Sequence, residues 1–322
     1  MRGMMRHFAG VLGFALCAVS VQAQTFPSKV VRIVVPFPAG GTADVLPRIL
    51  AEKLAAKWSQ PVIVENRAGA GGNIGAEAVA RADPDGHTLL ASPPGPIAIN
   101  HNLYPKLAFD PAKWVPVTVL AMVPNVLATR STLGARSVAE LIAHAKANAG
   151  KVTYASQGNG STSHLTGAMF QSMTGIQMLH VPYKGTAPAL TDLIAGQVDL
   201  FFDNIGSSLK QHQAGKIRIL AVASAQRANV LPDVPTLSEA ALPGFLSVTW
   251  FGVVAPEGTP APVAERISAA FAEAIRMPDV QKRFVEQGAD PVGNTPAEMA
   301  AFVKDEVSRW QKVIQDANVR LN

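Results

Sequence analysis

The segment Val31-Arg32-Ile33-Val34-Val35-Pro36-Phe37-Pro38-Ala39-Gly40-Gly41-Thr42-Ala43-Asp44 contains a complete strand–loop–helix unit. Residues 30–35 form a β-branched run that is too short for a helix and typical of a strand buried on both faces. Prolines and glycines then break the strand, and apolar residues at spacings of three and four follow from Leu46 to Trp58. This unit predicts an α/β protein in which a glycine-bearing loop leads from a buried strand into a helix.

The same order recurs along the rest of the chain. We expect strands over residues 61–65, 87–92, 151–156, 178–183, 198–203, 216–224 and 248–254. We expect helices after the glycine-rich loop 68–72 to about residue 82, and over 137–149, 161–174, 186–195, 206–214, 260–276 and from 295 onward. Two of them should begin with a capping box, Ser137 with Glu140 and Thr295 with Glu298. Residues 225–247 carry three prolines and are expected to be irregular. Short buried strands that alternate with helices indicate a mostly parallel α/β sheet.

The chain length of 322 residues indicates two domains. A second series of units begins near residue 137, and the strand-like segments 116–129 and 247–254 are the candidate crossings between the series. Two short extended crossings predict a hinge between rigid lobes. We expect a discontinuous first lobe (residues 24–122 plus 250–322) and a second lobe (residues 123–249).

The N-terminus has the order of a secretory signal peptide. Arg2 and Arg6 precede an uncharged apolar run over residues 8–21, and we expect cleavage after Ala23. A membrane anchor is the alternative, but the run is shorter than the roughly 20 residues that span a bilayer. Lipidation at Cys17 is opposed by Leu16, where a small residue is expected. We therefore expect residues 1–23 to be removed and the mature chain to be periplasmic.

Composition excludes several classes of function. The net charge of +5 is a mild excess, and no run of Lys or Arg exceeds two residues, so a nucleic-acid partner is not expected. The single cysteine excludes a disulfide framework and a thiolate zinc site. Dinucleotide, phosphate-loop and nucleophile-elbow motifs are absent from the sequence, and Ser161 and His164 lack an orienting acid for a hydrolase. We expect no catalytic residues, no metal and no cofactor.

Two glycine-bearing loops point to an anion. Residues 38–44 and 158–164 each follow a strand and open a helix, where unpaired N–H groups and the helix dipole face outward. Thr42, Ser161 and Thr162 add hydroxyl donors. The alternative is that both loops only turn the chain and cap helices.

Five further side chains could contribute to the site. Asp44 either caps its helix or holds a water, an amine or the opposite lobe. His164 either donates to a carboxylate or packs. Lys184 follows Tyr183 and is the only cation of these loops, yet lysines are mostly solvated. Asp203 and Asn204 end a strand and are candidates to order the same end of the sheet.

Four motifs together resemble the Bug family of exported solute receptors, the binding components of tripartite tricarboxylate transporters. They are residues 31–44, VRIVVPFPAGGTAD; 64–75, VENRAGAGGNIG; 83–90, DPDGHTLL; and 180–185, HVPYKG. The resemblance implies a type II periplasmic-binding-protein fold, with two α/β lobes joined by two hinge strands. It also implies closure on a carboxylate through backbone groups and waters. The segment 92–96, SPPGP, is more proline-rich than the usual family loop.

The resemblance and the loops together give one set of candidate ligand-binding residues: Phe37, Ala39, Gly40, Gly41, Thr42, Asp44, Ser92, Ser156, Gly160, Ser161, Thr162, His164, Tyr183, Lys184 and Asp203. We expect a monomeric exported receptor that closes on a small mono- or dicarboxylate and delivers it to the permease subunits of a tripartite transporter. The alternatives are an orphan ligand sensor that docks on a signalling protein, and an exported enzyme on the same fold.

Overall fold

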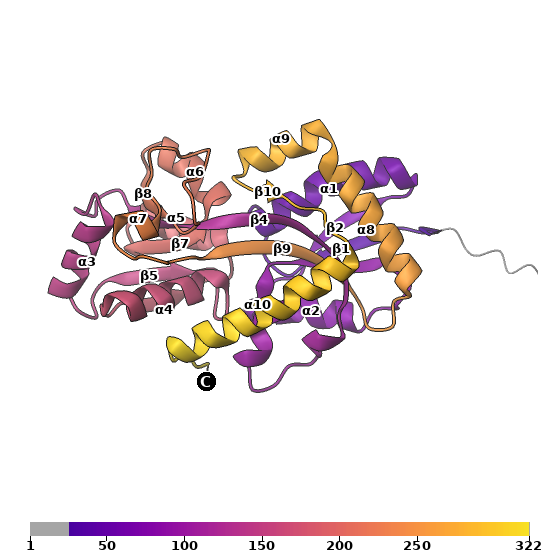
Figure 1. Ribbon diagram of the computed structural model, residues 1–322, viewed down its shortest axis with the longest axis horizontal. Coiled ribbons are helices and arrows are strands. Elements are labelled where there is room, and N and C mark those ends of the chain that lie inside the picture. The colour runs from indigo at the N-terminus through magenta and orange to yellow at the C-terminus, as the bar shows by residue number, and fades with distance from the viewer. Residues whose placement is uncertain (1–25, 322) are drawn as a thin grey trace, which may run out of the picture.

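The computed structural model describes residues 26–321, so the expected signal peptide lies outside the described residues. Two α/β lobes lie side by side along the longest axis of the molecule, and two long strands run between them (Figure 1). The first lobe contains β1–β3 with α1, α2 and α8, and the second contains β5–β8 with α3–α7. The strand order through the shared sheet is β2-β1-β3-β9-β4-β7-β5-β6. β8 and β10 also pair with β4, outside this order.

The first lobe is built on parallel strands. Its elements are β1 (Val31–Val35), α1 (Thr42–Trp58), β2 (Val62–Asn66), α2 (Asn73–Ala80) and β3 (Thr88–Ser92). β1 pairs in parallel with both β2 and β3, and its side chains are buried except at Arg32. Burial on both faces explains why the strand reads as an almost continuous apolar run. Short helical turns follow β3 at Gly95–Ile99, Asn100–Asn102 and Pro111–Lys113.

The second lobe repeats this arrangement. Its elements are α3 (Val138–Ala147), β5 (Thr153–Ser156), α4 (Thr162–Thr174), β6 (Leu179–Pro182), α5 (Thr186–Ala195), β7 (Leu200–Asn204), α6 (Ile205–Gln213), β8 (Ile217–Val222) and α7 (Leu237–Ala240). β5 pairs in parallel with β6 and β7. The prediction of mostly parallel sheets is confirmed within each lobe.

Two antiparallel strands cross between the lobes. β4 (Val115–Arg130) pairs with β9 (Val248–Ala255) along most of its length and continues into pairing with β7 and β8. β9 also pairs with β3, so the same two strands belong to the sheets of both lobes. The expected boundaries at residues 122/123 and 249/250 fall inside these strands and stay a prediction.

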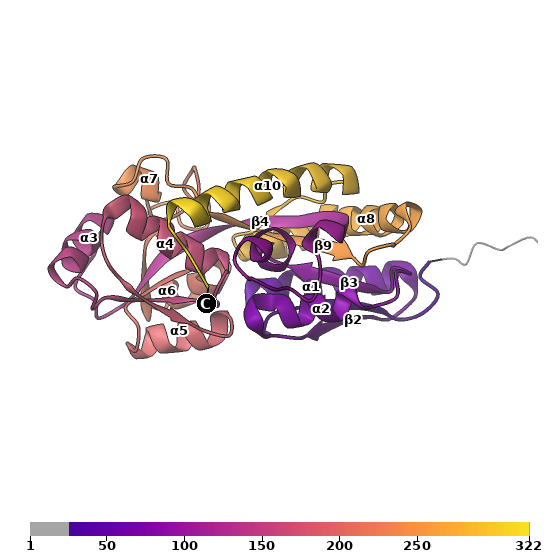
Figure 2. The ribbon, with the colours of Figure 1, turned by 90° about the horizontal axis from the view of Figure 1, so that it is seen from below.

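The C-terminal helices cover the first lobe and reach the second. They are α8 (Ala261–Arg276), α9 (Pro278–Glu286), which the sequence did not predict, and α10 (Pro296–Asp316), with the two-residue strand β10 (Asp290–Pro291) between α9 and α10. α10 runs along both lobes (Figure 2), and its Trp310 and Ile314 pack with Leu165 of α4. The carboxylate of Glu306 accepts hydrogen bonds from the indole N–H groups of Trp250 and Trp310, at 2.7 and 2.9 Å. These bonds attach α10 to the crossing strand β9.

The capping hydrogen bonds at the starts of α10 and α3 agree only in part with those expected from the sequence. The predicted capping box of Thr295 and Glu298 is present in full at the start of α10. At α3, Ser137 caps the backbone N–H of Glu140, but the Glu140 carboxylate accepts from the N–H of Arg136 instead of that of Ser137. That half of the expected capping box is therefore wrong.

Candidate ligand site between the lobes

Three helices from the two lobes begin around one small cavity. Its volume is about 20 Å³, and its walls are Phe37, Pro38, Gly41, Ala43, Pro93, Gln157, Thr186, Asn204 and Phe251. Gly41 and Ala43 belong to the start of α1, Thr186 is the first residue of α5, and Asn204 precedes α6. We call this space the inner cavity. Charged side chains do not line it within the described residues.

The three helix starts have free backbone donors. Gly41, Gly185 and Asn204 are the N-caps of α1, α5 and α6, and within residues 26–321 none of these helices has a side-chain cap hydrogen bond. Gly185 has a φ of 112°, a left-handed conformation that favours glycine. Because the first N–H groups of a helix lack intrahelical partners and carry the positive end of the dipole, their convergence favours an anion.

Among the described residues, Asn204 is the polar residue of the inner cavity wall whose amide oxygen is buried and unpaired. The residue is 4% exposed, and its Oδ1 atom has no hydrogen-bond partner among the described residues. Leaving a buried polar atom unpaired costs about 1–3 kcal/mol, so such groups are uncommon away from functional sites. The unpaired atom is an acceptor, so it suits a hydroxyl or water donor, and only the Nδ2 group of the same amide suits a carboxylate oxygen.

A hydrogen-bonded group behind the wall orients two of the lining residues. The Gln157 amide donates to the Thr186 hydroxyl and to Oδ1 of Asp203, both at 3.0 Å. Oδ2 of Asp203 accepts from Ser208 at 2.8 Å, and Asp203 itself is fully buried. Burial raises the pKa of Asp203 to about 7, against the hydrogen bonds that favour its ionised form. Asp203 therefore does not line the inner cavity, but it is hydrogen-bonded to two residues that do, Gln157 and Thr186.

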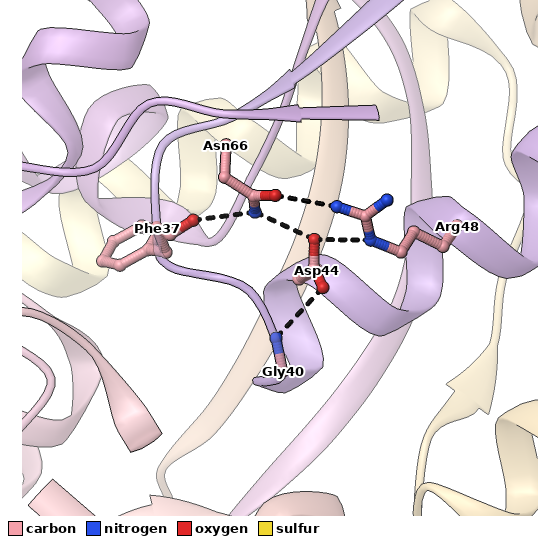
Figure 3. A network of polar contacts seen from close by, with 5 residues as sticks. All are labelled: Phe37, Gly40, Asp44, Arg48 and Asn66. Atoms are coloured by element: carbon pink, nitrogen blue, oxygen red, sulfur yellow. Dashed lines mark hydrogen bonds and ion pairs between the residues drawn. The ribbon is translucent and has the colours of Figure 1, made fainter. Parts of the chain in front are cut away.

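Asp44 occupies the corresponding place in the first lobe (Figure 3). Its Oδ2 accepts from the backbone N–H of Gly40 at 3.0 Å, and its Oδ1 accepts from Asn66 and Arg48 at 2.8 and 2.9 Å. Asn66 also donates to the carbonyl of Phe37. The Asp44 carboxylate thus holds both ends of the 37–40 loop, instead of capping the N–H groups of its own helix.

The predicted loop of the second lobe is held by two stacked histidines. The rings of His164 and His180 lie 4.0 Å apart with an interplanar angle of 6°, and Tyr154 stacks on the other face of His180. Nδ1 of His164 accepts from the N–H of Gly160, and Nε2 of His180 is 2.7 Å from the Ser156 hydroxyl. Burial lowers the pKa of His164 to about 4 and that of His180 to about 3, so both rings are neutral at pH 7.

The start of α4 is capped and packed. The Ser161 hydroxyl donates to the carbonyl of Gly158 and accepts from the N–H of His164. Thr162 forms a hydrogen bond with Thr249 of the crossing strand at 2.7 Å. The helix starts that line the inner cavity from the second lobe are therefore those of α5 and α6.

An outer cavity of about 320 Å³ continues from the inner one. Its walls are Pro36, Phe37, Pro38, Ala68, Gly69, Ala70, Gly71, Gly72, Tyr104, Gln157, Gly158, Asn159, Pro182, Tyr183 and Lys184. Phe37, Pro38 and Gln157 line both spaces, so the two cavities form one cleft between the lobes. The Tyr104 hydroxyl donates to the carbonyl of Asn159 at 3.1 Å across this cleft.

The structure thus divides the candidate residues into three groups. Phe37, Gly41, Tyr183 and Lys184 line the cleft. Thr42, Asp44, Ser92, Ser156, Gly160, Ser161, Thr162, His164 and Asp203 bond or pack behind its walls, and Ala39 and Gly40 are exposed on the loop. Among the residues behind the walls, the Ser92 hydroxyl donates to the carbonyl of Pro93. As ligand contacts all of them stay predictions.

The candidate set lacked Gln157, Thr186, Asn204 and Phe251. Thr186 stands where a strand leads into a helix, which is the signal that selected the other loops, so the sequence could have indicated it. Asn204 has the same signal and is considered beside Asp203, but the candidate set does not include it. Phe251 lies inside the crossing strand β9 and carries no such signal.

Three other features of the described chain bear on function. No group of three or more His, Cys, Asp or Glu residues within 26–321 is arranged to hold a metal ion. A larger groove of about 580 Å³ lies between Trp114 and Val303 of α10, but its walls are mostly apolar and come from the first lobe, β4, β9 and α10. None of the described helices is both long and apolar enough to cross a bilayer.

Two α/β lobes joined by two crossing strands around such a cleft define a periplasmic solute-binding protein. The model of the tripartite tricarboxylate transporter family receptor matches residues 46–319, and the chain belongs to this family. It is 39% identical to protein BugT of Bordetella pertussis over 323 residues, which cover 98% of this chain and 99% of that protein.

Solved structures agree with this family. R. palustris Rpa4515 with adipate has a TM-score of 0.89 and 39% identity, covering 92% of this chain and 99% of that one. The periplasmic binding protein BugD has a TM-score of 0.87 and 36% identity, covering 92% and 99%. The expected fold class and family resemblance are confirmed.

Proposed function

We propose that this chain is an exported receptor that closes its two lobes on a small carboxylate and delivers it to the permease subunits of a tripartite transporter. One observation carries the proposal: the starts of α1, α5 and α6, which have no side-chain caps among the described residues, meet at one small cavity. The adipate bound to the similar R. palustris protein supports the ligand class.

The carboxylate would bind at the inner cavity and the rest of the ligand would extend into the outer one. Gly41, Thr186 and Asn204 line the first of these positions, and the backbone N–H groups that begin α1 and α5 would donate to the carboxylate there. Phe37 and Tyr183 would contact the body of the ligand, and the exposed Lys184 would attract anions at the rim. In this proposal the carboxylate is bound by helix N-termini and neutral amides, without an arginine side chain.

The lobes would have to separate before a ligand enters, because the inner cavity of about 20 Å³ holds little more than a water molecule. β4 and β9 would supply the hinge. We propose further that the chain acts as a monomer in the periplasm after cleavage behind Ala23.

A thermal-shift panel tests the ligand class. Mono- and dicarboxylates, adipate among them, are compared with the matching alcohols and amides, which keep the shape and lack the charge. A carboxylate at about 100 times its dissociation constant should stabilise the protein by roughly 2.7 kcal/mol. Stabilisation by no carboxylate, or equal stabilisation by the neutral analogues, would contradict the proposal.

Uptake of the stabilising acid tests delivery. Cells that lack this chain should lose high-affinity uptake of that acid, and the wild-type chain should restore it. Unchanged uptake in the deletion strain would contradict the transport role and favour a sensor.

A further inference from the structure

Among the described residues, Asp203 has no counter-ion, and it lies at the back of the proposed ligand site. It is fully buried at the end of β7, and its partners are the Gln157 amide, the Thr186 and Ser208 hydroxyls and the N–H of Asn204. All four are neutral. Because an ionised carboxylate without a cation is costly in a buried site, its charge depends on what else enters the cavity.

Charged groups elsewhere do not compensate it. The titratable side chains on the elements packed against β7 each have another partner or face solvent. Arg130 of β4 pairs with Asp199, which precedes β7; Tyr154 of β5 and His164 of α4 stack on His180. Asp192 of α5 accepts from Tyr183; His212 of α6 accepts from the N–H of Ile219, and Lys210 of α6 is exposed. Among the described residues, Asp203 therefore faces only neutral donors.

We propose that Asp203 is a proton-binding site coupled to the ligand site, so that the protein takes up a proton when it binds a carboxylate. This inference rests on the proposed function. A ligand carboxylate held by Thr186 and Asn204 places a second negative charge one residue away from Asp203, and like charges in a buried site raise the affinity for a proton. The proton would reside on Oδ2, which then donates to the Ser208 hydroxyl at 2.8 Å instead of accepting from it.

The pH range follows from the free protein. The pKa of Asp203 is about 7, so below pH 6 the group already carries its proton and binding takes up none. Above pH 7 the Asp203 carboxyl is ionised in the free protein, and we expect it to be protonated in the complex. The affinity should then fall by up to about tenfold per pH unit, with uptake approaching one proton per ligand.

Calorimetric titration of adipate into the full chain tests this, in pairs of buffers that share a pH and differ in ionisation enthalpy, from pH 5.5 to 8.5. We expect buffer-dependent heats above pH 7, and equal heats in both buffers at pH 5.5. Binding with equal heats at every pH would overturn the inference and leave the proposed function standing. If adipate and the other panel acids do not bind at all, the proposed function itself fails.

Two variants, one in β7 and one at the residue before it, identify the group that binds the proton. Asp203→Asn keeps the size of the side chain, and its complex should form without proton uptake and with an affinity independent of pH between 6 and 8.5. Asp199→Asn is the matched control, because Asp199 pairs with Arg130 and should leave the uptake unchanged. Uptake that persists in Asp203→Asn would overturn the inference. If that variant does not fold, the pH dependence of the wild-type chain decides alone.

Discussion

The hydroxyl of Thr42 lies 3.2 Å from the hydroxyl of Ser207. Thr42 is the first residue of α1 in the first lobe, and Ser207 lies in the first turn of α6 in the second lobe. The bond therefore joins two helix starts that line the cleft from opposite sides, and it forms only where the lobes are closed.

Removing this bond should weaken ligand binding without affecting either lobe. A neutral hydrogen bond contributes about 0.5–1.5 kcal/mol, so Ser207→Ala should raise the dissociation constant of the bound acid roughly two- to tenfold. Isothermal titration measures the effect. Ser308→Ala on the exposed side of α10 is the control and should bind as the wild type does. Identical affinities for Ser207→Ala and the wild type would show that the contact does not contribute to closure.

A methyl group at Gly41 should obstruct closure. A Cβ at this position would lie 3.3 Å from the Thr186 hydroxyl in the opposite lobe, although the φ of −87° is acceptable for any residue. We expect Gly41→Ala to lower ligand affinity severalfold while the unfolding midpoint of the free protein stays the same. Gly134→Ala is the matched control, since its Cβ would meet nothing within 4 Å. Full affinity in Gly41→Ala would contradict the closed arrangement of these two helix starts.

Asp44→Asn should damage the loop of the first lobe. The Asp44 carboxylate accepts hydrogen bonds from Gly40, Asn66 and Arg48. In Asp44→Asn one of its two oxygens becomes an NH₂ group, which cannot accept a hydrogen bond from the donor it faces. We expect a loss of about 1–3 kcal/mol of stability, and weaker ligand binding because the 37–40 loop is no longer fixed. Denaturant unfolding measures the first effect and titration the second. The exposed Asp83→Asn should change neither, and equal behaviour of the two variants would argue against a positioning role for Asp44.

The histidine stack should make the fold sensitive to acid. Burial lowers the pKa of His164 to about 4 and that of His180 to about 3, below the 6.5 of an exposed histidine, so the folded state favours the neutral rings. The stability this provides is present above pH 6.5 and is lost as the pH falls toward 4, on the order of 3 kcal/mol for His164. Asp203, whose pKa is raised, contributes with the opposite sign, because its stabilisation grows as the pH falls from 7 toward 3.8.

Comparison of variants at each pH separates the two contributions. His164→Asn should lose less free energy of unfolding than the wild type between pH 6.5 and 4.5. His144→Asn, on the exposed face of α3, should follow the wild-type curve. Parallel curves for His164→Asn and the wild type would exclude the stack as the origin of the acid sensitivity.

Local patterns in the sequence predict most of the fold but only part of the site. The β-branched run of β1 and the capping box at Thr295 specify their elements through neighbouring residues alone, and both predictions are confirmed. The roles of Asp44 and Asp203 depend on partners 22 and 46 residues away, Asn66 and Gln157, which no local pattern indicates. The position of Phe251 in the cleft depends on how β9 crosses between the lobes.

A crystal structure of the chain with the acid that gives the largest thermal shift tests the binding site most directly. The ligand carboxylate should lie within hydrogen-bond distance of the Asn204 amide and of the N–H groups that begin α1 and α5, with its body toward Phe37 and Tyr183. A carboxylate bound outside this cleft, or in it but beyond reach of Asn204 and Thr186, would contradict the proposed site.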